Sequence, residues 1–424
     1  MKDFEGFILD LKNLISINTV EGTPTKDAPF GENNKVALNL TLSLAKEMGF
    51  KTINYNNYAG EIVFGEGEEF GIIGHLDVVP AGDGWNTDPF NLTITEDRVI
   101  GRGVIDDKTP LLLCLYAFKE LKNSGFVPNK KFRLFLGSNE ETGWKDVEYL
   151  QKATILPEYG FSPDGDFPLS YAEKGILIVE FKLPKLKNFY SICGGTVINA
   201  VCGKASVKTD IEIDQKLLDK HGLSKNGNVI ESIGKTCHGS HPELGINAIG
   251  KLFNLFLDCG ENVESVVDNL FNDNGGLSGL SSEQGITTLS PNIVKEDDNY
   301  IYLKCDCRFP YPIEKEQITK ILDTFNIEYT ATIKHPTQYV NKDGDFVNAL
   351  ISAYNSVTGE NGKPIAIGGS TFARVFKKGV SFGPSFKWSK SGAHDANESM
   401  SISELKTCYN IYKQAIININ QIKN

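Results

Sequence analysis

The chain has 424 residues, of which 40% are hydrophobic and 23% charged, and its formal net charge is -11 at pH 7. This length predicts two domains, because a single hydrophobic core rarely grows beyond about 250–300 residues. The acidic balance argues against nucleic acid or an anionic membrane as a partner. No apolar stretch reaches the ~20 residues that a membrane-spanning helix needs.

The N-terminal segment and the cysteines predict a cytoplasmic protein. The start, "MKDFEGFILDLKNLI", alternates charged and apolar residues like an amphipathic helix and lacks the features of a signal peptide. The eight cysteines are scattered with no C-x-x-C spacing, which is typical of thiols in a reducing compartment. Cys305 and Cys307 alternate along one predicted strand, and we expect them to be core thiols rather than a metal pair.

The first 175 residues have an α/β pattern. Helical periodicity occurs near 3–16 and 34–48, and short apolar runs at 70–74 and 132–137 predict buried strands. Between these runs, "TPLLLCLYAFKELKNSG" has a helical period and ends at Gly125. The order strand, helix, strand predicts a βαβ unit in a parallel sheet.

From residue 176 to 337 the pattern changes. The alternating runs "ILIVEFKL" and "NYIYLKCDCRF" bracket the helix-like "GINAIGKLFNLFLD", which predicts an inserted α+β domain. Afterwards "DFVNALISAYNSVTG" predicts a helix, "PIAIGG" and "VSFGP" predict short strands, and Ser401 and Glu404 form a capping box before a helix to about Ile422. We therefore predict an α/β domain, with a mixed, mostly parallel sheet flanked by helices, from 1–175 and 338–424.

Groups of metal-ligand type occur where predicted strands or helices end. His75 and Asp77 follow the 70–74 run and share one face of the strand, as a metal ligand and a carboxylate that orients it would. The other candidates are Asp106 and Asp107 in "GRGVIDDK", Glu140 and Glu141 in "NEETGW", Asp164 in "FSPDGDFP" and His394 in "AHDANE". Ligands of open α/β sheets bind at the carboxyl ends of the strands, where these groups would meet.

Each segment also has an ordinary structural explanation. Asp106 and Asp107 suit the first turn of a helix, Asp164 suits a Pro/Gly turn, and His394 could be any loop histidine. The segments nevertheless share one chemistry and one predicted sheet edge. Nitrogen and oxygen ligands of this kind suit zinc, manganese or cobalt.

These segments, together with "CHGSHPELGINA", "CDCRFP" and "GGSTFARVFKKGVSFGP", occur in an order that resembles the co-catalytic dinuclear metallopeptidases. That family includes aminoacylase, carboxypeptidase G and succinyl-diaminopimelate desuccinylase. The resemblance covers roughly residues 3 to 422. The variants "VPAGDGW", "EETGW" and "SPDGDFP" are most similar to the PepV-type bacterial dipeptidases.

The resemblance implies roles for the metal-site residues. Asp106 would bridge two divalent metal ions, zinc first and manganese or cobalt as alternatives. His75 and Asp164 would complete the ligands of one ion, and Glu141 and His394 those of the other. Asp77 would orient His75. Glu140 would be the general base that takes a proton from the attacking water.

The resemblance also implies residues that bind a small peptide substrate. His238, Asn199 and Arg308 lie in the inserted domain, which would act as a lid, and Arg374 lies after it. His238 would stabilise charge on the substrate carbonyl, and Arg308 would bind the C-terminal carboxylate. Their ordinary alternatives are a solvated loop histidine and an arginine on a solvent-facing strand. The implied activity is that of a dipeptidase, with an N-acyl-amino-acid deacylase as the alternative.

Four positions depart from the family pattern. Thr109 stands where glycine is common, and Cys202 replaces the usual proline in "NAVC". Asp395 follows His394 where glutamine is usual, and Asp166 adds a carboxylate near Asp164. The extra acids suggest a shift of metal preference towards manganese. The size of the insertion favours a monomer, with a homodimer as the alternative.

Overall fold

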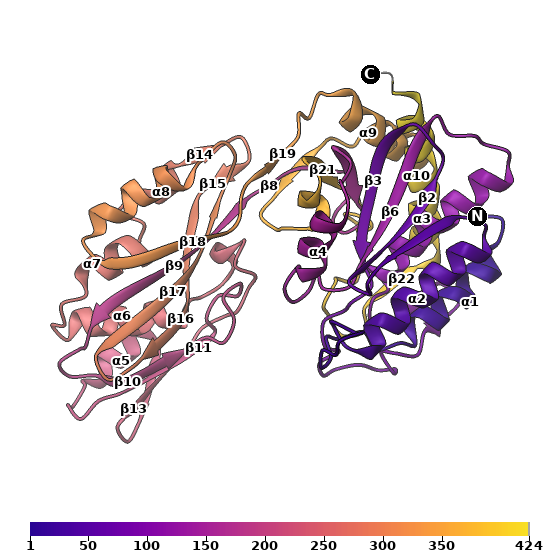
Figure 1. Ribbon diagram of the computed structural model, residues 1–424. Coiled ribbons are helices and arrows are strands. Elements are labelled where there is room, and N and C mark those ends of the chain that lie inside the picture. Colours follow the sequence, from indigo (N-terminus) through magenta and orange to yellow (C-terminus); the bar gives the residue numbers. More distant parts are fainter. Residues whose placement is uncertain (423–424) are drawn as a thin grey trace. The chain divides into compact units, whose positions relative to one another are not determined.

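The computed structural model describes residues 1–422, which form two compact units (Figure 1). The first unit contains Met1–Tyr171, Tyr339–Ile365 and the segment that starts at Ser370. The second unit contains Ala172–Gln338 together with the short segment Ala366–Gly369. Its main part is therefore inserted between two stretches of the first unit.

The segment Ala366–Gly369 differs from the prediction, which placed it with the C-terminal part of the first domain. The backbone N–H of Lys174 donates to the carbonyl of Ile367 over 3.1 Å. Arg308 Nη1 donates to the carbonyl of Gly368 over 3.0 Å. These contacts attach the segment to the second unit. Four residues carry no periodicity from which such a pairing could be predicted.

A nine-stranded mixed sheet organises the first unit, in the order β1-β2-β6-β3-β7-β21-β8-β19, with β20 paired to β8. Its four central neighbours, β6, β3, β7 and β21, run parallel to one another. The strands are β1 (Lys51–Tyr55), β2 (Ala59–Phe64), β3 (Glu68–His75), β6 (Lys130–Gly137), β7 (Tyr159–Ser162), β8 (Ser170–Glu173), β19 (Gln338–Tyr339), β20 (Ile365–Ile367) and β21 (Lys378–Ser381). The predicted mixed α/β fold is confirmed.

Helices flank this sheet (Figure 1). They are α1 (Phe4–Ile15), α2 (Glu32–Glu47), α3 (Lys108–Asn123), α4 (Lys145–Ala153), α9 (Asp345–Thr358) and α10 (Ile402–Gln421). The predicted βαβ unit is confirmed, since α3 joins the parallel neighbours β3 and β6. The predicted capping box is also present: Ser401 Oγ accepts the N–H of Glu404, whose side chain accepts the N–H of Ser401. A separate small sheet has the order β22 (Ser399–Ser401), β5 (Arg98–Ile100) and β4 (Thr93–Ile94).

The second unit is an eight-stranded sheet in the order β12-β13-β11-β10-β16-β17-β9-β18, with antiparallel neighbours. Its strands are β9 (Gly175–Pro184), β10 (Tyr190–Gly194), β11 (Lys204–Lys208), β12 (Leu223–Asn226), β13 (Val229–Ile233), β16 (Thr288–Glu296), β17 (Tyr300–Phe309) and β18 (Glu328–His335). This unit also contains helices and a short hairpin. The helices are α5 (Gln215–His221), α6 (Ala248–Asp258), α7 (Glu264–Val266) and α8 (Lys315–Leu322), and the hairpin consists of β14 (Ser281–Ser282) and β15 (Gly285–Ile286). The prediction of an α+β insertion is confirmed.

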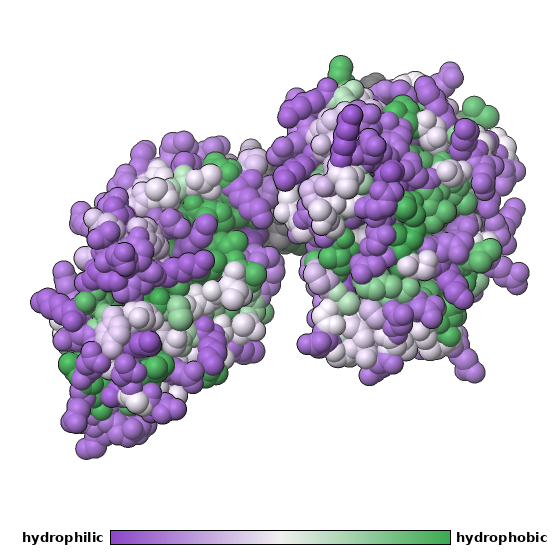
Figure 2. Space-filling model, turned by 60° about the horizontal axis from the view of Figure 1, so that its bottom comes forward, coloured by the Kyte–Doolittle hydropathy of each residue, from purple (hydrophilic) through white to green (hydrophobic). Residues whose placement is uncertain are grey.

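The cysteines and the surface agree with an ordinary folded protein. All eight cysteines carry free thiols, and Cys305 and Cys307 belong to the hydrophobic core of the second unit, as predicted. Figure 2 shows hydrophilic residues over most of the drawn face of each unit, with apolar residues between them. Within residues 1–422, we find no helix that is both long enough and apolar enough to span a membrane.

Candidate metal centre

The candidate ligands gather where parallel strands end. His75 is the last residue of β3, and it lies opposite Gly137, the last residue of the parallel neighbour β6. Glu140 and Glu141 follow β6, and Asp164 follows β7, the other parallel neighbour of β3. The carboxyl ends of parallel strands meet at one edge of a sheet, so these four side chains reach the same place.

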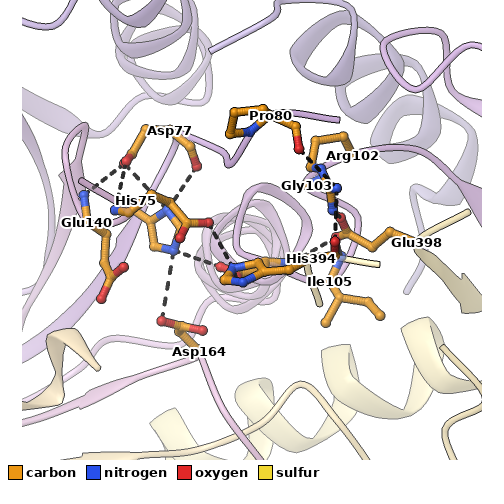
Figure 3. Close-up of polar contacts among 12 residues, drawn as sticks. His75, Asp77, Pro80, Arg102, Gly103, Ile105, Glu140, Asp164, His394 and Glu398 are labelled. Carbon is orange, nitrogen blue, oxygen red and sulfur yellow. Dashed lines mark hydrogen bonds and ion pairs between the residues drawn. The ribbon is translucent and has the colours of Figure 1, made fainter. Parts of the chain in front are cut away.

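Asp106 lies at the centre of the group. Its Oδ1 is 2.8 Å from His75 Nε2, and its Oδ2 is 2.9 Å from His394 Nε2. His75 Nε2 is also 3.8 Å from Asp164 Oδ2, and His394 Nε2 is 3.1 Å from Glu141 Oε1 (Figure 3). The two oxygens of Asp106 therefore face two separate pairs of side chains.

Asp77 supports the group in two ways. Its backbone carbonyl lies 2.9 Å from His75 Nδ1, and its Oδ1 lies 3.4 Å from the same nitrogen. Both carboxylate oxygens also accept backbone N–H groups, Oδ1 from Glu140 and Oδ2 from Glu141, each over 3.1 Å. Asp77 therefore orients His75 so that Nε2 points into the group, and it fixes the loop that carries both glutamates.

Asp107 adjoins the group, and the peptide bond that links it to Asp106 is cis. Asp107 Oδ2 accepts the backbone N–H of His75 over 3.2 Å, and the residue is fully buried. The carboxylate therefore holds the end of β3 in place. Asp107 was a candidate ligand from its sequence, and the structure gives its carboxylate a hydrogen bond to the backbone of His75 instead.

The distances suit a divalent cation. Ligand atoms about 2.1 Å from a tetrahedral zinc ion lie about 3.4 Å from one another. The four contacts among these side chains range from 2.8 to 3.8 Å. One atom from each of His75, Asp106 and Glu141 lies within 4.8 Å of the other two. His75 Nε2 and Asp106 Oδ1 are buried without a hydrogen bond of good geometry, although they are close enough for an ion pair. The donor set therefore fits a metal ion.

The pKa shifts of the carboxylates also indicate a cation site. Burial raises the pKa of Glu140 well above its usual value, and Asp164, Glu141 and Asp106 add to this by repulsion. Burial and repulsion from Asp106 likewise raise the pKa of Asp164 to about 8. Carboxylates that repel one another in a buried site are stabilised by a cation among them.

The two histidines are held by these carboxylates. Burial lowers the pKa of His75, but Asp106 and Asp77 outweigh it and hold the pKa well above the usual value. Hydrogen bonds to Asp106 and Glu141 raise the pKa of His394 to about 11. A metal-ligating histidine must be neutral, so cation binding at these nitrogens is coupled to proton release.

Arg102 and Glu398 form a fully buried ion pair that the sequence did not predict. Both lie inside quoted motifs, "GRGVIDDK" and "AHDANE". The sequence feature that could have identified them is their position, since each is a charged residue in the same short motif as a candidate ligand. Figure 3 shows them beside His394.

In the second unit, three predicted substrate-binding residues share one neighbourhood. The backbone N–H of Gly239 donates to the Asn199 carbonyl over 2.7 Å, next to His238, whose Nδ1 lies 2.6 Å from Ser240 Oγ. A side chain at Gly239 would come within 2.6 Å of Asp306 Oδ2.

Asp306 also holds Arg308, whose Nε and Nη2 donate to its two oxygens over 2.8 Å each. Arg308 is only 4% exposed, so it does not lie on a solvent-facing surface. Asn199 and His238 are exposed. Arg374 is half-buried in the 3-10 helix Phe372–Val375 of the first unit.

The departures from the family pattern have distinct surroundings. Thr109 is fully buried in α3, and Cys202 is buried in the second unit. Asp395 is exposed, and burial raises the pKa of Asp166. Asp395 and Asp166 each lie within two residues of a candidate ligand.

Comparison with known proteins identifies the class. The family described as Peptidase family M20/M25/M40 matches residues 71–418, so the chain belongs to this family of peptidases. The resemblance to dinuclear metallopeptidases is thereby confirmed at the level of the family.

Individual proteins agree with this assignment. A beta-Ala-Xaa dipeptidase from Lactobacillus delbrueckii subsp. lactis is 32% identical over 98% of this chain and 96% of its own length. The solved structure of the di-peptidase Dug1p from Saccharomyces cerevisiae has a TM-score of 0.62 at 16% identity, covering 99% of this chain and 97% of that one. A Bacillus subtilis protein described as a dinuclear metal-binding peptidase has a TM-score of 0.53 at 10% identity, covering 99% and 100%.

Proposed function

We propose that this chain is a metal-dependent dipeptidase that hydrolyses the peptide bond of short peptides with a free C-terminal carboxylate. The observation that carries the proposal is Asp106, whose two carboxylate oxygens face two different histidines. A carboxylate placed in this way could hold two adjacent cations, one through each oxygen. The similarity to a beta-Ala-Xaa dipeptidase over nearly the whole chain supports a dipeptide as the substrate.

In this proposal Asp106 would be shared between two divalent ions. His75 and Asp164 would hold one ion, and Glu141 and His394 would hold the other, which matches the two pairs of contacts on either side of Asp106. The relative described as a dinuclear metal-binding peptidase supports the number of ions. Bound divalent cations supply Lewis acidity, which lowers the pKa of water towards about 7 and polarises a carbonyl.

Glu140 acts as the general base. Its backbone is held by Asp77, and Figure 3 shows its side chain pointing away from Asp77. The carboxylate accepts a proton from the attacking water at one oxygen and returns it to the leaving amine. The adjacent residue Glu141 contacts His394 instead, so the two glutamates divide the work of proton transfer and metal binding.

We further propose that the inserted unit is a lid that binds substrate. His238 donates to the substrate carbonyl, where negative charge develops. Arg308 binds the C-terminal carboxylate through the N–H groups that Asp306 and Gly368 do not use. Asn199 and Arg374 provide further polar contacts.

Zinc is the proposed metal, with manganese or cobalt as alternatives. The ligand set of two histidines and three carboxylates accepts all three ions. Asp166 and Asp395 add carboxylates near the site, which favours a harder ion. Higher activity with manganese than with zinc would support this effect, and the opposite order would contradict it.

We propose that the enzyme works in the cytoplasm as a monomer. The free cysteines support a reducing compartment. Light scattering at the concentration used for assays tests the oligomeric state, and a mass of twice the 46.7 kDa of one chain would replace the monomer by a homodimer.

The decisive experiment is hydrolysis by metal-stripped protein resupplied with zinc, manganese or cobalt. The substrate panel contains β-alanyl and α-linked dipeptides, one tripeptide and two N-acyl amino acids. Glu140→Ala is compared with Glu96→Ala, which removes an exposed carboxylate of the same unit. We expect metal-dependent dipeptide cleavage that Glu140→Ala abolishes and Glu96→Ala retains. Cleavage of N-acyl amino acids alone would replace the dipeptidase by a deacylase.

A further inference from the structure

A buried ion pair lies beside the candidate metal centre. Arg102 Nη1 is 2.7 Å from Glu398 Oε2, and their side chains are 1% and 0% exposed. Burial of two charges costs roughly as much free energy as their attraction returns, so such a pair adds little net stability. The stability of the fold therefore does not explain this pair by itself.

Glu398 binds the backbone of the loop that carries Asp106. Its Oε1 accepts the backbone N–H groups of Ile105 over 2.6 Å and of Asp106 over 3.2 Å. Its Oε2 accepts the N–H of Gly103 over 3.1 Å in addition to the bond from Arg102 (Figure 3). One carboxylate therefore fixes the backbone on both sides of Ile105, and with it the position from which the Asp106 side chain extends.

Arg102 reaches the loop that carries His394. Its Nη2 donates to the carbonyl of His394 over 3.2 Å, and its Nη1 donates to the carbonyl of Asp395 over 3.4 Å. Nη2 also contacts the carbonyls of Pro80 and Ala81, in the loop that follows β3. A single guanidinium thus joins the loops after β3 and before β22.

His394 needs such support. Its φ is 67°, in the left-handed region that residues with a side chain rarely adopt. A residue in this region keeps its conformation only when its surroundings determine it. The side chain of His394 is 53% exposed, so its own packing contributes little restraint.

We propose that Arg102 and Glu398 are positioning residues that hold Asp106 and His394 at the spacing at which both bind metal. The pair connects the two ligand-bearing loops through one ion pair and backbone hydrogen bonds, and neither residue is among the proposed metal ligands. This inference rests on the proposed metal centre and names residues to which no ligand role has been given.

The test compares Glu398→Gln and Arg102→Lys with the wild type. Glutamine offers one acceptor oxygen where the carboxylate offers two, so it leaves N–H groups of the Asp106 loop without an acceptor. Lysine retains a charge for Glu398, but it has no planar fork to reach the carbonyls of His394 and Asp395 as well.

Glu61→Gln is the matched control. Glu61 is 1% exposed and receives Nε and Nη2 of Arg133 over 2.8 Å each, so it is also a buried carboxylate paired with arginine. Glu61 also accepts a hydrogen bond from the hydroxyl of Tyr55 over 2.5 Å, and none of these residues belongs to the metal centre. The control therefore reproduces the loss of a buried ion pair without the loss of loop support.

The readout is the zinc dissociation constant of each site, measured by competition with a chelator on metal-stripped protein, with thermal unfolding recorded in parallel. We expect Glu398→Gln and Arg102→Lys to weaken zinc binding 10- to 100-fold, as loss of residues that support metal ligands does. Glu61→Gln should lower thermal stability and change the dissociation constants less than twofold.

Each outcome decides between the alternatives. Wild-type zinc affinity in a folded Glu398→Gln or Arg102→Lys protein would overturn the inference, and so would equal weakening in Glu61→Gln. If Glu398→Gln does not fold, Arg102→Lys decides, because it retains a charge for the ion pair. Wild-type protein that binds no divalent ion would instead contradict the metal centre itself.

Discussion

Replacing Asp77 by asparagine tests the support of the proposed catalytic loop. The two oxygens of Asp77 each accept one backbone N–H over 3.1 Å, from Glu140 and from Glu141, and the side chain is buried. An asparagine retains one carbonyl oxygen, and its NH₂ group must face the other N–H. The variant therefore loses one charge-assisted hydrogen bond and leaves one buried donor without a partner.

The expected magnitude follows from these two losses. A hydrogen bond to a charged group contributes about 1.5–3 kcal/mol, and an unsatisfied buried donor costs about 1–3 kcal/mol. We expect the free energy of unfolding to fall by about 3 kcal/mol, since the loop can relax in part. Displacement of Glu140 and reorientation of His75 should lower kcat/KM by about 10- to 100-fold.

The assay combines urea unfolding with dipeptide hydrolysis at saturating metal. Asp88→Asn is the control, because Asp88 is exposed and also accepts a backbone N–H, from Phe90 over 2.9 Å. That control should change the free energy of unfolding by less than about 0.5 kcal/mol. If Asp77→Asn retains wild-type kcat/KM and stability, Asp77 does not hold the loop and the reasoning fails.

Three further predictions concern packing, pH and metal. A Cβ at Gly74 would overlap the carboxylate of Asp107, so Gly74→Ala should lower the free energy of unfolding by about 1–3 kcal/mol. A Cβ at Gly279 would meet nothing within 4 Å, so Gly279→Ala should change the free energy of unfolding little. Equal effects of the two variants in urea unfolding would contradict this reasoning. Burial raises the pKa of Glu120, but hydrogen bonds, first from Tyr409, lower it to about 2, below the unfolded value of 4.5. Glu120 therefore contributes stability above about pH 4.5 that is lost as the pH falls towards 2. Glu120→Gln should lower the free energy of unfolding by on the order of 1 kcal/mol near pH 6, after solvent screening, and should not change it near pH 2. Removing metal with a chelator should lower the unfolding temperature, because an ion whose free concentration is 100 times its Kd stabilises the folded protein by about 2.7 kcal/mol. Calorimetry in which stripped and reloaded protein unfold at the same temperature would refute this.

Local sequence patterns predict much of the fold, because each depends on neighbours along the chain. The capping box at Ser401 and the stop at Gly125 have counterparts in α10 and α3, which end within one or two residues of the predicted limits. The apolar runs at 70–74 and 132–137 correspond to β3 and β6. Burial of both faces of a central strand leaves such runs without polar residues, which makes them recognisable.

The sequence by itself determined which residues are candidates, since ligand-type side chains follow the ends of the predicted strands. Only the tertiary structure decided which of them meet, because His75 and His394 are 319 positions apart along the chain and both lie within 3 Å of Asp106. It also decided the partners of Arg102 and Glu398. Their contacts are mainly with backbone groups, and backbone hydrogen bonds between distant loops leave no pattern in side-chain identity.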